Sequence, residues 1–358
     1  MSPRIFLLSA LLTTIPAAIA PAAHVVLVAG GGTSPTGVPA TEAKLVTPFG
    51  IDFDRSGNAF LVELNGNRVL KIDARGRLTT LAGTGKKGFG GDGGPAASAD
   101  LNGPHNLAVA PNGDVYVADT WNNRVRKIDA KTGVITSFAG TGEKGFAGDG
   151  GPADKARFGG IYCITFSPDG RKLHLADLDN RRIRAIDMAT TVVTTVAGNG
   201  QKGVPDDGAR AAEAPLVDPR AVASHADGNV YVLERSGHAL RVVSPDGRIR
   251  TVVGTGQKGF GGDGGPARKA NLNGPKHLCV DRAGDVIIAD SENHCIRRYS
   301  PKTGMVTRVA GTGKVGQGGV GGPPEQVELK QPHGVALAAD GTLYICDSIN
   351  DRVLKIVP

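Results

Sequence analysis

Six side chains at equivalent positions of a repeated segment could take part in chemistry together. Each stands near the start of an apolar segment, in five cases directly after a proline. They are Phe49, His105, Tyr162, Arg220, Lys276 and His333. Two imidazoles with an open position suit a zinc ion, while a phenol and a guanidinium suit a base and an oxyanion partner. These residues form a site only if the fold brings the six positions together.

Further candidates lie in a turn that follows the second apolar segment of each repeat. Most repeats carry Asp there and Asn three residues later, as in Asp119 and Asn122, whereas two repeats carry Glu63 and Glu234 and lack the Asn. Short Asx side chains bond their own backbone in turns, so the recurring Asp and Asn are interpreted as turn chemistry. The departures Glu63 and Glu234, and Trp121 in one of these turns, are therefore ligand-binding candidates.

Glycine-rich loops of the form GFGGDGGPA or GFAGDGGPA follow the fourth segment of three repeats and place one carboxylate in each loop, Asp92, Asp149 and Asp263. A calcium loop needs several oxygens at alternate positions, and one carboxylate per loop is few. No GK[ST] sequence follows, which excludes a nucleotide P-loop. We expect crossover loops that end in a short helical turn, with a cation site as the alternative.

The elements that must position these residues are strands. A small apolar residue, Ala or Val, stands directly before a glycine pair or a Gly-x-Gly sequence at positions 29, 82, 139, 197, 253 and 310. These positions are about 57 residues apart, which indicates a repeat. Within a unit, apolar residues alternate with a period of two, and turns such as Asn112-Gly113 separate four such segments. Four antiparallel strands repeated six times predict an all-β chain folded as a six-bladed β-propeller.

The two ends of the chain complete one blade. The last unit stops at RVLKIVP, its third strand, and the missing fourth strand is found at 25–30. Joining the ends within a blade closes the ring and removes exposed sheet edges. The predicted domain is 23–358, and its units cover approximately 46–85, 101–142, 158–200, 216–256, 272–313 and 329–358 plus 25–30.

Strand direction then defines one face. The starts of the first strands, the Asp-x-x-Asn turns and the glycine-rich loops all fall at the same end of the blades. Innermost strands line the central channel, and ligand sites favour such openings. We therefore expect the six residues at the mouth of the channel, on the face that carries the glycine-rich loops.

The units resemble NHL repeats. Five open with TPFGIDF, GPHNLAV, DPRAVAS, GPKHLCV and QPHGVAL, the third opens with IYCITF, and segments such as VYVAD and Asn-x-Arg follow. With their added loops they look like the secreted NHL propellers of bacteria and the NHL ring of teneurins. The resemblance covers the whole predicted domain and implies the fold. Because the family includes both binding modules and enzymes, it leaves the function open.

An enzyme alternative follows from a second likeness, to peptidylglycine α-amidating lyase, whose zinc is held by histidines at comparable strand starts. It implies His105 and His333 as metal ligands and Tyr162 and Arg220 as catalytic candidates. A third ligand is missing, because alternation along a strand should point His277 to the face opposite Lys276. The gluconolactonase family uses carboxylate and amide ligands for its metal, and the ring carries no carboxylate at that level.

The N-terminus predicts export. Arg4, the apolar run 5–15 and small residues up to Ala23 have the order of a signal peptide, with cleavage after Ala22. No segment is apolar enough over about 20 residues to span a membrane. We expect a secreted or periplasmic protein. Its four cysteines, at 163, 279, 295 and 346, are expected to be buried free thiols.

The formal net charge is +7. Basic residues alternate along third strands such as 124–129, which predicts a solvated outer strand face. No basic stripe is interleaved with aromatic residues, so nucleic acid is not an expected partner. The combined prediction is a monomeric binding module for a protein, peptide or glycan on the glycine-loop face, without a cofactor. The alternative is a metal-dependent lyase or hydrolase at the channel mouth, with zinc or calcium.

Overall fold

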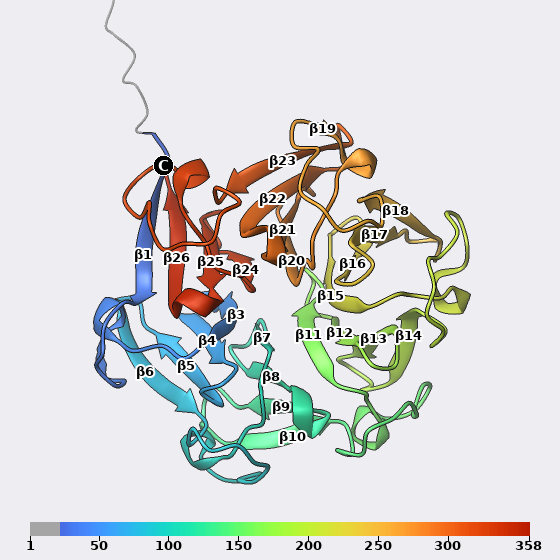
Figure 1. Cartoon of the computed structure of the whole chain (residues 1–358). Helices are drawn as coiled ribbons and strands as arrows, with labels where there is room; N and C mark the ends of the chain where they lie inside the picture. Colours follow the sequence, from blue (N-terminus) through green and yellow to red (C-terminus); the bar gives the residue numbers. More distant parts are fainter. Residues whose placement is uncertain (1–21) are drawn as a thin grey trace, which may run out of the picture.

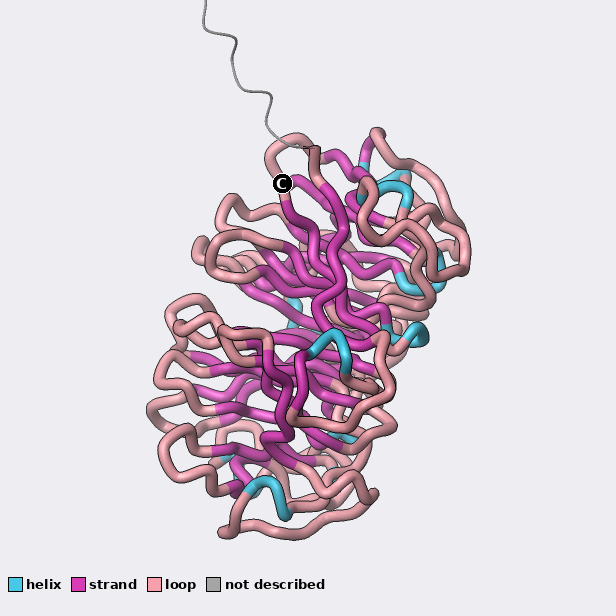
Figure 2. The backbone as a smooth tube through the Cα atoms, turned by 90° about the vertical axis from the view of Figure 1, so that its left-hand side faces the viewer, coloured by secondary structure: helices cyan, strands magenta, loops and turns pink. Residues whose placement is uncertain are grey.

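The computed structural model describes residues 22–358. The predicted signal peptide, 1–22, lies outside the described residues except for Ala22. Six sheets stand around a central axis, and the chain passes through them in order (Figure 1). Seen from the side, the strands run between two faces made of turns and loops (Figure 2). The predicted six-bladed β-propeller is confirmed.

Every blade consists of four antiparallel strands, numbered from the channel outwards. Blade one contains β3 (Pro48–Phe53), β4 (Ala59–Glu63), β5 (Arg68–Ile72) and β6 (Arg77–Ala82). Blade two contains β7 (Asn106–Val109), β8 (Val115–Asp119), β9 (Arg124–Ile128) and β10 (Ile135–Ala139). Blade three contains β11 (Ile161–Phe166), β12 (Lys172–Asp177), β13 (Arg182–Asp187) and β14 (Val193–Ala197).

The second half of the ring repeats this order. Blade four contains β15 (Pro219–Ser224), β16 (Val230–Glu234), β17 (Ala239–Val243) and β18 (Ile249–Val253). Blade five contains β20 (His277–Val280), β21 (Val286–Asp290), β22 (Cys295–Ser300) and β23 (Met305–Ala310). Blade six contains β24 (Val335–Leu337), β25 (Leu343–Asp347), β26 (Arg352–Val357) and β1 (His24–Gly30).

The N-terminal strand closes the ring as the sequence predicts. The sheet of blade six has the order β1-β26-β25-β24, so its outermost strand comes from the beginning of the chain. Val25 pairs with Ile356, and Gly30 pairs with Arg352. Figure 1 shows β1 beside β26, close to the C-terminus. The two ends of the propeller are therefore held in one sheet.

Apolar side chains pack between neighbouring blades. Between blades one and two, for example, Val62 and Val69 join Leu107, Val117 and Ile128 in one buried cluster. Alternation along each strand supplies a row of such side chains to either side of the blade. Complete burial of one aliphatic side chain contributes about 1.5–3 kcal/mol, so these contacts are the main source of the ring's stability.

The glycine-rich loops lead from each outermost strand across the edge of the next blade. Pro95 bridges to Val134 of blade two, and β19 (Gly265–Pro266) adds a short strand beside β23, as β2 (Val38–Pro39) does beside β6. These contacts cover strand edges that would otherwise be open to pairing. Each loop ends in a 3₁₀ turn: η1 (Ala40–Glu42), η2 (Ala96–Ser98), η4 (Ala153–Lys155), η5 (Ala211–Glu213), η6 (Ala267–Lys269) and η8 (Pro324–Gln326).

The motif of Asp177 and Asn180 forms a simple turn, and the other three Asp-x-x-Asn motifs form 3₁₀ turns at the same face as the loops. They are η3 (Thr120–Asn122), η7 (Ser291–Asn293) and η9 (Ser348–Asn350). Asn122 Nδ2 donates to Asp119 Oδ2 at 2.8 Å and also to the Gly88 carbonyl at 2.8 Å, which ties the turn to the glycine-rich loop. The interpretation of this motif as turn chemistry agrees with these bonds.

The prediction of a solvated face on the third strands was wrong for four arginines. Their side chains are completely buried: Arg126, Arg184, Arg241 and Arg297. The loop from the preceding blade folds over this part of the strand and shields it from water. Burial raises the pKa of the neighbouring Asp119 to about 6, although Asn122 and other partners oppose the shift.

Within the described residues, no helix has the length and apolar character needed to cross a membrane. The four cysteines are free thiols, as predicted, and three of them are buried. Cys279 is the exception in its exposure, because its side chain lines the central channel.

Candidate functional site

Five of the six predicted ring residues form one contact cluster at the loop end of the channel. The Phe49 ring stacks on His333 with 3.7 Å between ring centroids, and the His105 ring contacts Tyr162 at 4.5 Å. Arg220 lies over the Tyr162 ring at 4.3 Å and donates to Nε2 of His333 at 2.8 Å. These contacts plug this end of the channel instead of leaving an open mouth.

β-Bulges place the ring residues. In β15, Pro219 pairs with Glu234 and Ala221 with Leu233, so Arg220 is an extra residue without its own partner. Tyr162 occupies the same position in β11. A bulge changes the direction of its side chain, and here it turns the second residue of the innermost strand toward the axis.

The remaining predicted candidates lie around this plug. Lys276 turns away from it and pairs with Glu292 at 2.9 Å. Trp121 covers His105 from the loop side, with 5.7 Å between ring centroids, and 46% of its surface stays exposed. Gly103 allows this position, because a Cβ there would collide with the Trp121 ring. Trp121 is thus more exposed than Tyr162 and Lys276, which are half-buried.

Glu63 and Glu234 are not brought to the channel mouth. Both are completely buried in their turns. Glu63 accepts from Val46 N at 2.7 Å and from Arg68 Nε at 2.8 Å, and Glu234 makes the equivalent bonds to Val217 N and Arg241. These carboxylates therefore replace the Asp-x-x-Asn turn structurally, and no ligand can reach them in this arrangement.

The two histidines do not form a zinc site in this geometry. His105 Nδ1 donates to the Gly103 carbonyl at 2.9 Å, while His333 Nε2 is used by Arg220. The imidazole centroids lie 6.4 Å apart. In the part of the chain that the structure describes, no three His, Cys, Asp or Glu side chains gather closely enough to hold a metal ion. The donor set does not fit the zinc centre of the lyase.

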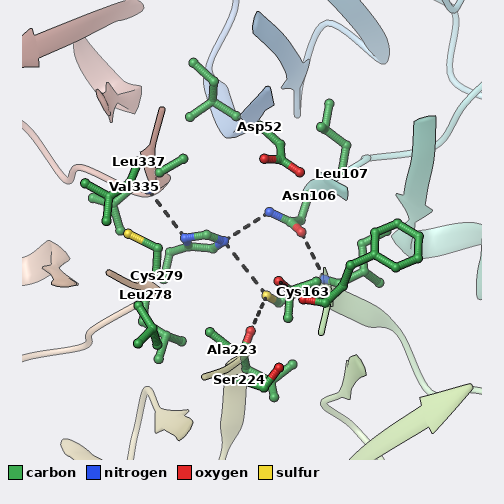
Figure 3. A pocket seen from close by; sticks show the side chains of 18 of the residues that line it. Asp52, Asn106, Leu107, Cys163, Ala223, Ser224, Leu278, Cys279, Val335 and Leu337 are labelled. Carbon is green, nitrogen blue, oxygen red and sulfur yellow. Dashed lines mark hydrogen bonds between the residues drawn. The ribbon is translucent and has the colours of Figure 1, made fainter. Parts of the chain in front are cut away.

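Below the plug lies a cavity of about 230 Å³ in the channel (Figure 3). Its lining comes from the innermost strands of all six blades and reaches Pro168 in the β11–β12 turn, which belongs to the face opposite the glycine-rich loops. Polar groups on the wall include Asp52, Asn106, Cys163, Ser224 and His277. The open part of the channel is therefore on the other side of the plug from the loops.

A hydrogen-bond network crosses this cavity. Ile164 N donates to Asn106 Oδ1 at 2.9 Å, which leaves Asn106 Nδ2 facing His277 Nε2 at 3.0 Å. The Cys163 sulfur lies 3.9 Å from the same Nε2 and 3.6 Å from the Val222 carbonyl. In Figure 3 dashed lines reach the imidazole from Asn106, from Cys163 and from Val335, whose backbone N donates to His277 Nδ1 at 3.4 Å.

The thiol in this network is not an activated nucleophile. Burial raises the pKa of Cys163 to about 11, and burial together with Arg220 lowers the pKa of His277 to about 4. A thiolate nucleophile needs a lowered pKa and a basic partner. The Asn106–His277–Cys163 network therefore acts as a structural link across the channel.

His277 points into the channel, whereas the neighbouring Lys276 turns toward Glu292. The backbone N of Lys276 donates to the Ala289 carbonyl, and His277 pairs with the same Ala289 in the sheet. Two successive residues therefore oppose one residue of β21, and the regular alternation is interrupted there. The sequence does contain a signal for His277. It occupies the repeat position that directly follows a ring residue, and the same position carries Asn106 in blade two and Cys163 in blade three.

Asp52 lies deeper in the channel and was also not singled out from the sequence. Its carboxylate accepts from Val109 N at 2.8 Å and from Phe53 N at 2.8 Å. Burial raises the pKa of Asp52 to about 6, although these two bonds lower it. The channel wall therefore carries a carboxyl group whose pKa is close to neutral.

The most exposed apolar groups belong to the glycine-rich loops. Three loops repeat the sequence Lys-Gly-Phe, and the side chains of both residues are exposed; we call this set the loop rim: Lys87, Phe89, Lys144, Phe146, Lys258 and Phe260. Phe89 stacks on Arg124 at 4.4 Å and Phe146 on Arg182 at 3.6 Å. The rim therefore presents rings and positive charges on the face where the loops lie.

The loop carboxylates, considered above as cation ligands, face arginines. Asp149 pairs with Arg184 at 2.6 Å, and Asp263 pairs with Arg297 at 2.8 Å. Asp92 makes the same contact with Arg126 at 2.7 Å. Each carboxylate thus neutralises a buried guanidinium.

Known proteins share the repeat. The NHL repeat family matches residues 101–128 and 272–299. The chain is 29% identical over 269 residues to the protein SUPPRESSOR OF QUENCHING 1 of Arabidopsis thaliana, covering 72% of this chain and 25% of that protein. It is 26% identical over 342 residues to NHL repeat-containing protein 2 of Gallus gallus, covering 87% and 46%. Teneurin-1 of Gallus gallus is 27% identical over 283 residues, covering 68% and 10%. The chain spans less than half the length of these relatives.

A solved structure supports the architecture. An auxiliary nutrient binding protein from Bacteroides thetaiotaomicron superimposes with a TM-score of 0.67 at 16% identity, covering 94% of this chain and 76% of that one. At this identity the likeness concerns the fold. The repeat matches, the relatives and the closed ring lead to one conclusion: the chain is a six-bladed β-propeller that matches the NHL repeat at 101–128 and 272–299 and is similar to NHL-repeat proteins.

Proposed function

We propose that this propeller is an exported binding module whose ligand, a protein or peptide, docks on the loop rim. The observation that carries the proposal is the threefold repetition of an exposed phenylalanine beside an exposed lysine. Phe89, Phe146 and Phe260 are 48%, 43% and 50% exposed. Exposed large apolar groups of this kind mark interaction surfaces, and aromatic and arginine side chains are enriched where proteins bind one another.

The charge of the rim favours an acidic ligand. The lysines of the rim stand beside the rings, and Arg124 and Arg182 lie beneath two of them. The whole chain carries a formal net charge of +7, which steers acidic partners toward it. A structural neighbour described as a nutrient binding protein supports a binding role. The proposed role calls for no cofactor, and a monomer suffices for it.

The experiment compares binding by the wild-type protein and by a triple variant of the rim, F89A/F146A/F260A. Both are tested against a displayed random-peptide library and a glycan array, which separates a peptide ligand from a glycan. A control variant, R75A/K131A/R171A, changes exposed residues in turns of the opposite face. We expect peptide hits that the control retains and the rim variant loses. Hits retained equally by the rim variant, or hits on glycans alone, would overturn the proposal as stated.

A further inference from the structure

Arg220 is a buried cation without a carboxylate partner. Its side chain is 3% exposed, at the plug of the channel. One nitrogen, Nη2, donates to His333 Nε2 at 2.8 Å, while Nε and Nη1 are buried and have no hydrogen-bond partner. A guanidinium carries five N–H donors and stays charged in proteins. Leaving such donors unpaired in a buried place is costly.

His333 adds another unpaired donor. Because its Nε2 accepts from Arg220, the proton of the neutral imidazole is on Nδ1. Nδ1 is also buried without a partner. Burial and Arg220 lower the pKa of His333 well below its usual value, which keeps the ring neutral. The pair therefore offers only donors to its surroundings.

The rest of the fold shows how unusual this is. The buried arginines of the third strands each meet a carboxylate, as Arg126 meets Asp92, Arg184 meets Asp149 and Arg241 meets Glu234. For Arg220 no ion pair exists among the described residues. The nearby Asp218 is bound to Arg235 at 2.8 Å. Between Ala22 and Pro358, a negative group is thus missing at one buried arginine only.

We propose that Arg220 and His333 form an anion site that binds a single carboxylate or phosphate group of a ligand on the loop face. This inference deepens the proposed function and rests on it for the origin of the ligand. Charged hydrogen bonds from arginine to such groups are among the strongest in proteins. Tyr162, which stacks on Arg220, and Lys276 are half-buried members of the ring, and in this proposal the anion has to enter beside them.

The probes are inorganic phosphate and acetate, which separate a phosphate from a carboxylate, with chloride at equal ionic strength as reference. Binding is measured by calorimetry and by the rise in melting temperature of the wild type, R220Q and R250Q. Arg250 is an exposed residue of the same blade, so R250Q removes an equal charge elsewhere. We expect one of the two anions to stabilise the wild type and R250Q, and R220Q to bind it at least about tenfold more weakly.

Two results would overturn the site: neither anion stabilises the wild type beyond chloride, or R220Q responds as the wild type does. If R220Q does not fold, R220K serves in its place, and it should weaken binding because lysine lacks the planar fork of arginine. The rim variant F89A/F146A/F260A should keep its response to the anion. Loss of peptide binding with retained anion binding, or the reverse, therefore shows which of the two proposals fails.

Discussion

Arg184 Nη2 donates to Asp149 Oδ1 at 2.6 Å, and this ion pair joins β13 of blade three to the glycine-rich loop that comes from blade two. The guanidinium also donates to the carbonyls of Arg157 and Ala147 at 2.8 and 2.9 Å, which hold the far end of the same loop. One buried side chain therefore fixes the path of the loop. The loops are consequently rigid supports for the rim, and Phe146 rests on this arginine and its neighbour Arg182.

Removing the carboxylate should destabilise the protein. In D149N the buried Arg184 loses its shorter ion pair and keeps only the longer one to Asp177 at 3.7 Å, and hydrogen bonds to charged groups contribute about 1.5–3 kcal/mol each. We expect urea unfolding to show a loss of this order in the free energy of unfolding. D154N, in the exposed 3₁₀ turn of the same loop, is the control and should change it by less than about 0.5 kcal/mol. Equal effects of the two variants would contradict a role of Asp149 as the clamp.

The repeat predicts the blades well because each blade is a local structure. The spacing from Ala82 to Ala139 and the alternation within it depend only on neighbouring strands and short turns, so number, order and closure of the blades follow. The burial of Arg184 could not be foreseen in the same way. It depends on a loop that leaves the preceding blade and folds over the strand. The alternation of apolar and polar residues along the strand does not show that a loop covers it.

The site was predictable only in part, for a similar reason. The ring positions could be found by aligning the repeats, and the structure gathers Phe49, His105, Tyr162, Arg220 and His333. The directions of the neighbouring side chains could not be predicted in this way, because the innermost strands carry bulges at the ring positions. A bulge lets two successive residues reach the axis, as Tyr162 does at the plug and Cys163 does in the channel.

A buried histidine should make the protein sensitive to acid. Burial lowers the pKa of His174 to about 4, whereas in the unfolded chain it stays near 6.5. Below pH 6.5 the unfolded chain binds a proton that the folded protein refuses until about pH 4, so stability falls over this window. The loss for this one group amounts to about 3 kcal/mol.

H174L removes this effect. The difference in free energy of unfolding between wild type and H174L should therefore move in favour of the variant as the pH is lowered from 7.5 to 4.5. The buried aspartates, such as Asp119, act in the opposite direction over the same range, so the comparison between variants is needed. A pH-independent difference for H174L would contradict the argument.

The cysteines should be inert in the folded protein. Burial raises the pKa of Cys163 to about 11 and raises the pKa values of Cys279, Cys295 and Cys346 as well. Thiolates are the reactive species, so a thiol reagent at pH 8 should label the native protein slowly. In denaturant the same reagent should count four thiols. A lower count would reveal a disulfide, and rapid labelling of the native protein would point to an accessible thiolate at Cys279.

Opening the ring should cost more than any single substitution. Deletion of Val25–Gly30 removes β1, leaves β26 as an open edge and exposes Val25 and Ala29, which are completely buried. Because every blade packs on two neighbours, the loss of this strand weakens the contact between blades six and one as well. We expect thermal unfolding, followed by circular dichroism, to shift down by more than about 10 °C. Deletion of residues 2–21 is the matched control, and it should leave the melting temperature unchanged. If both truncated proteins melt like the full chain, the pairing of β1 with β26 does not hold the propeller together.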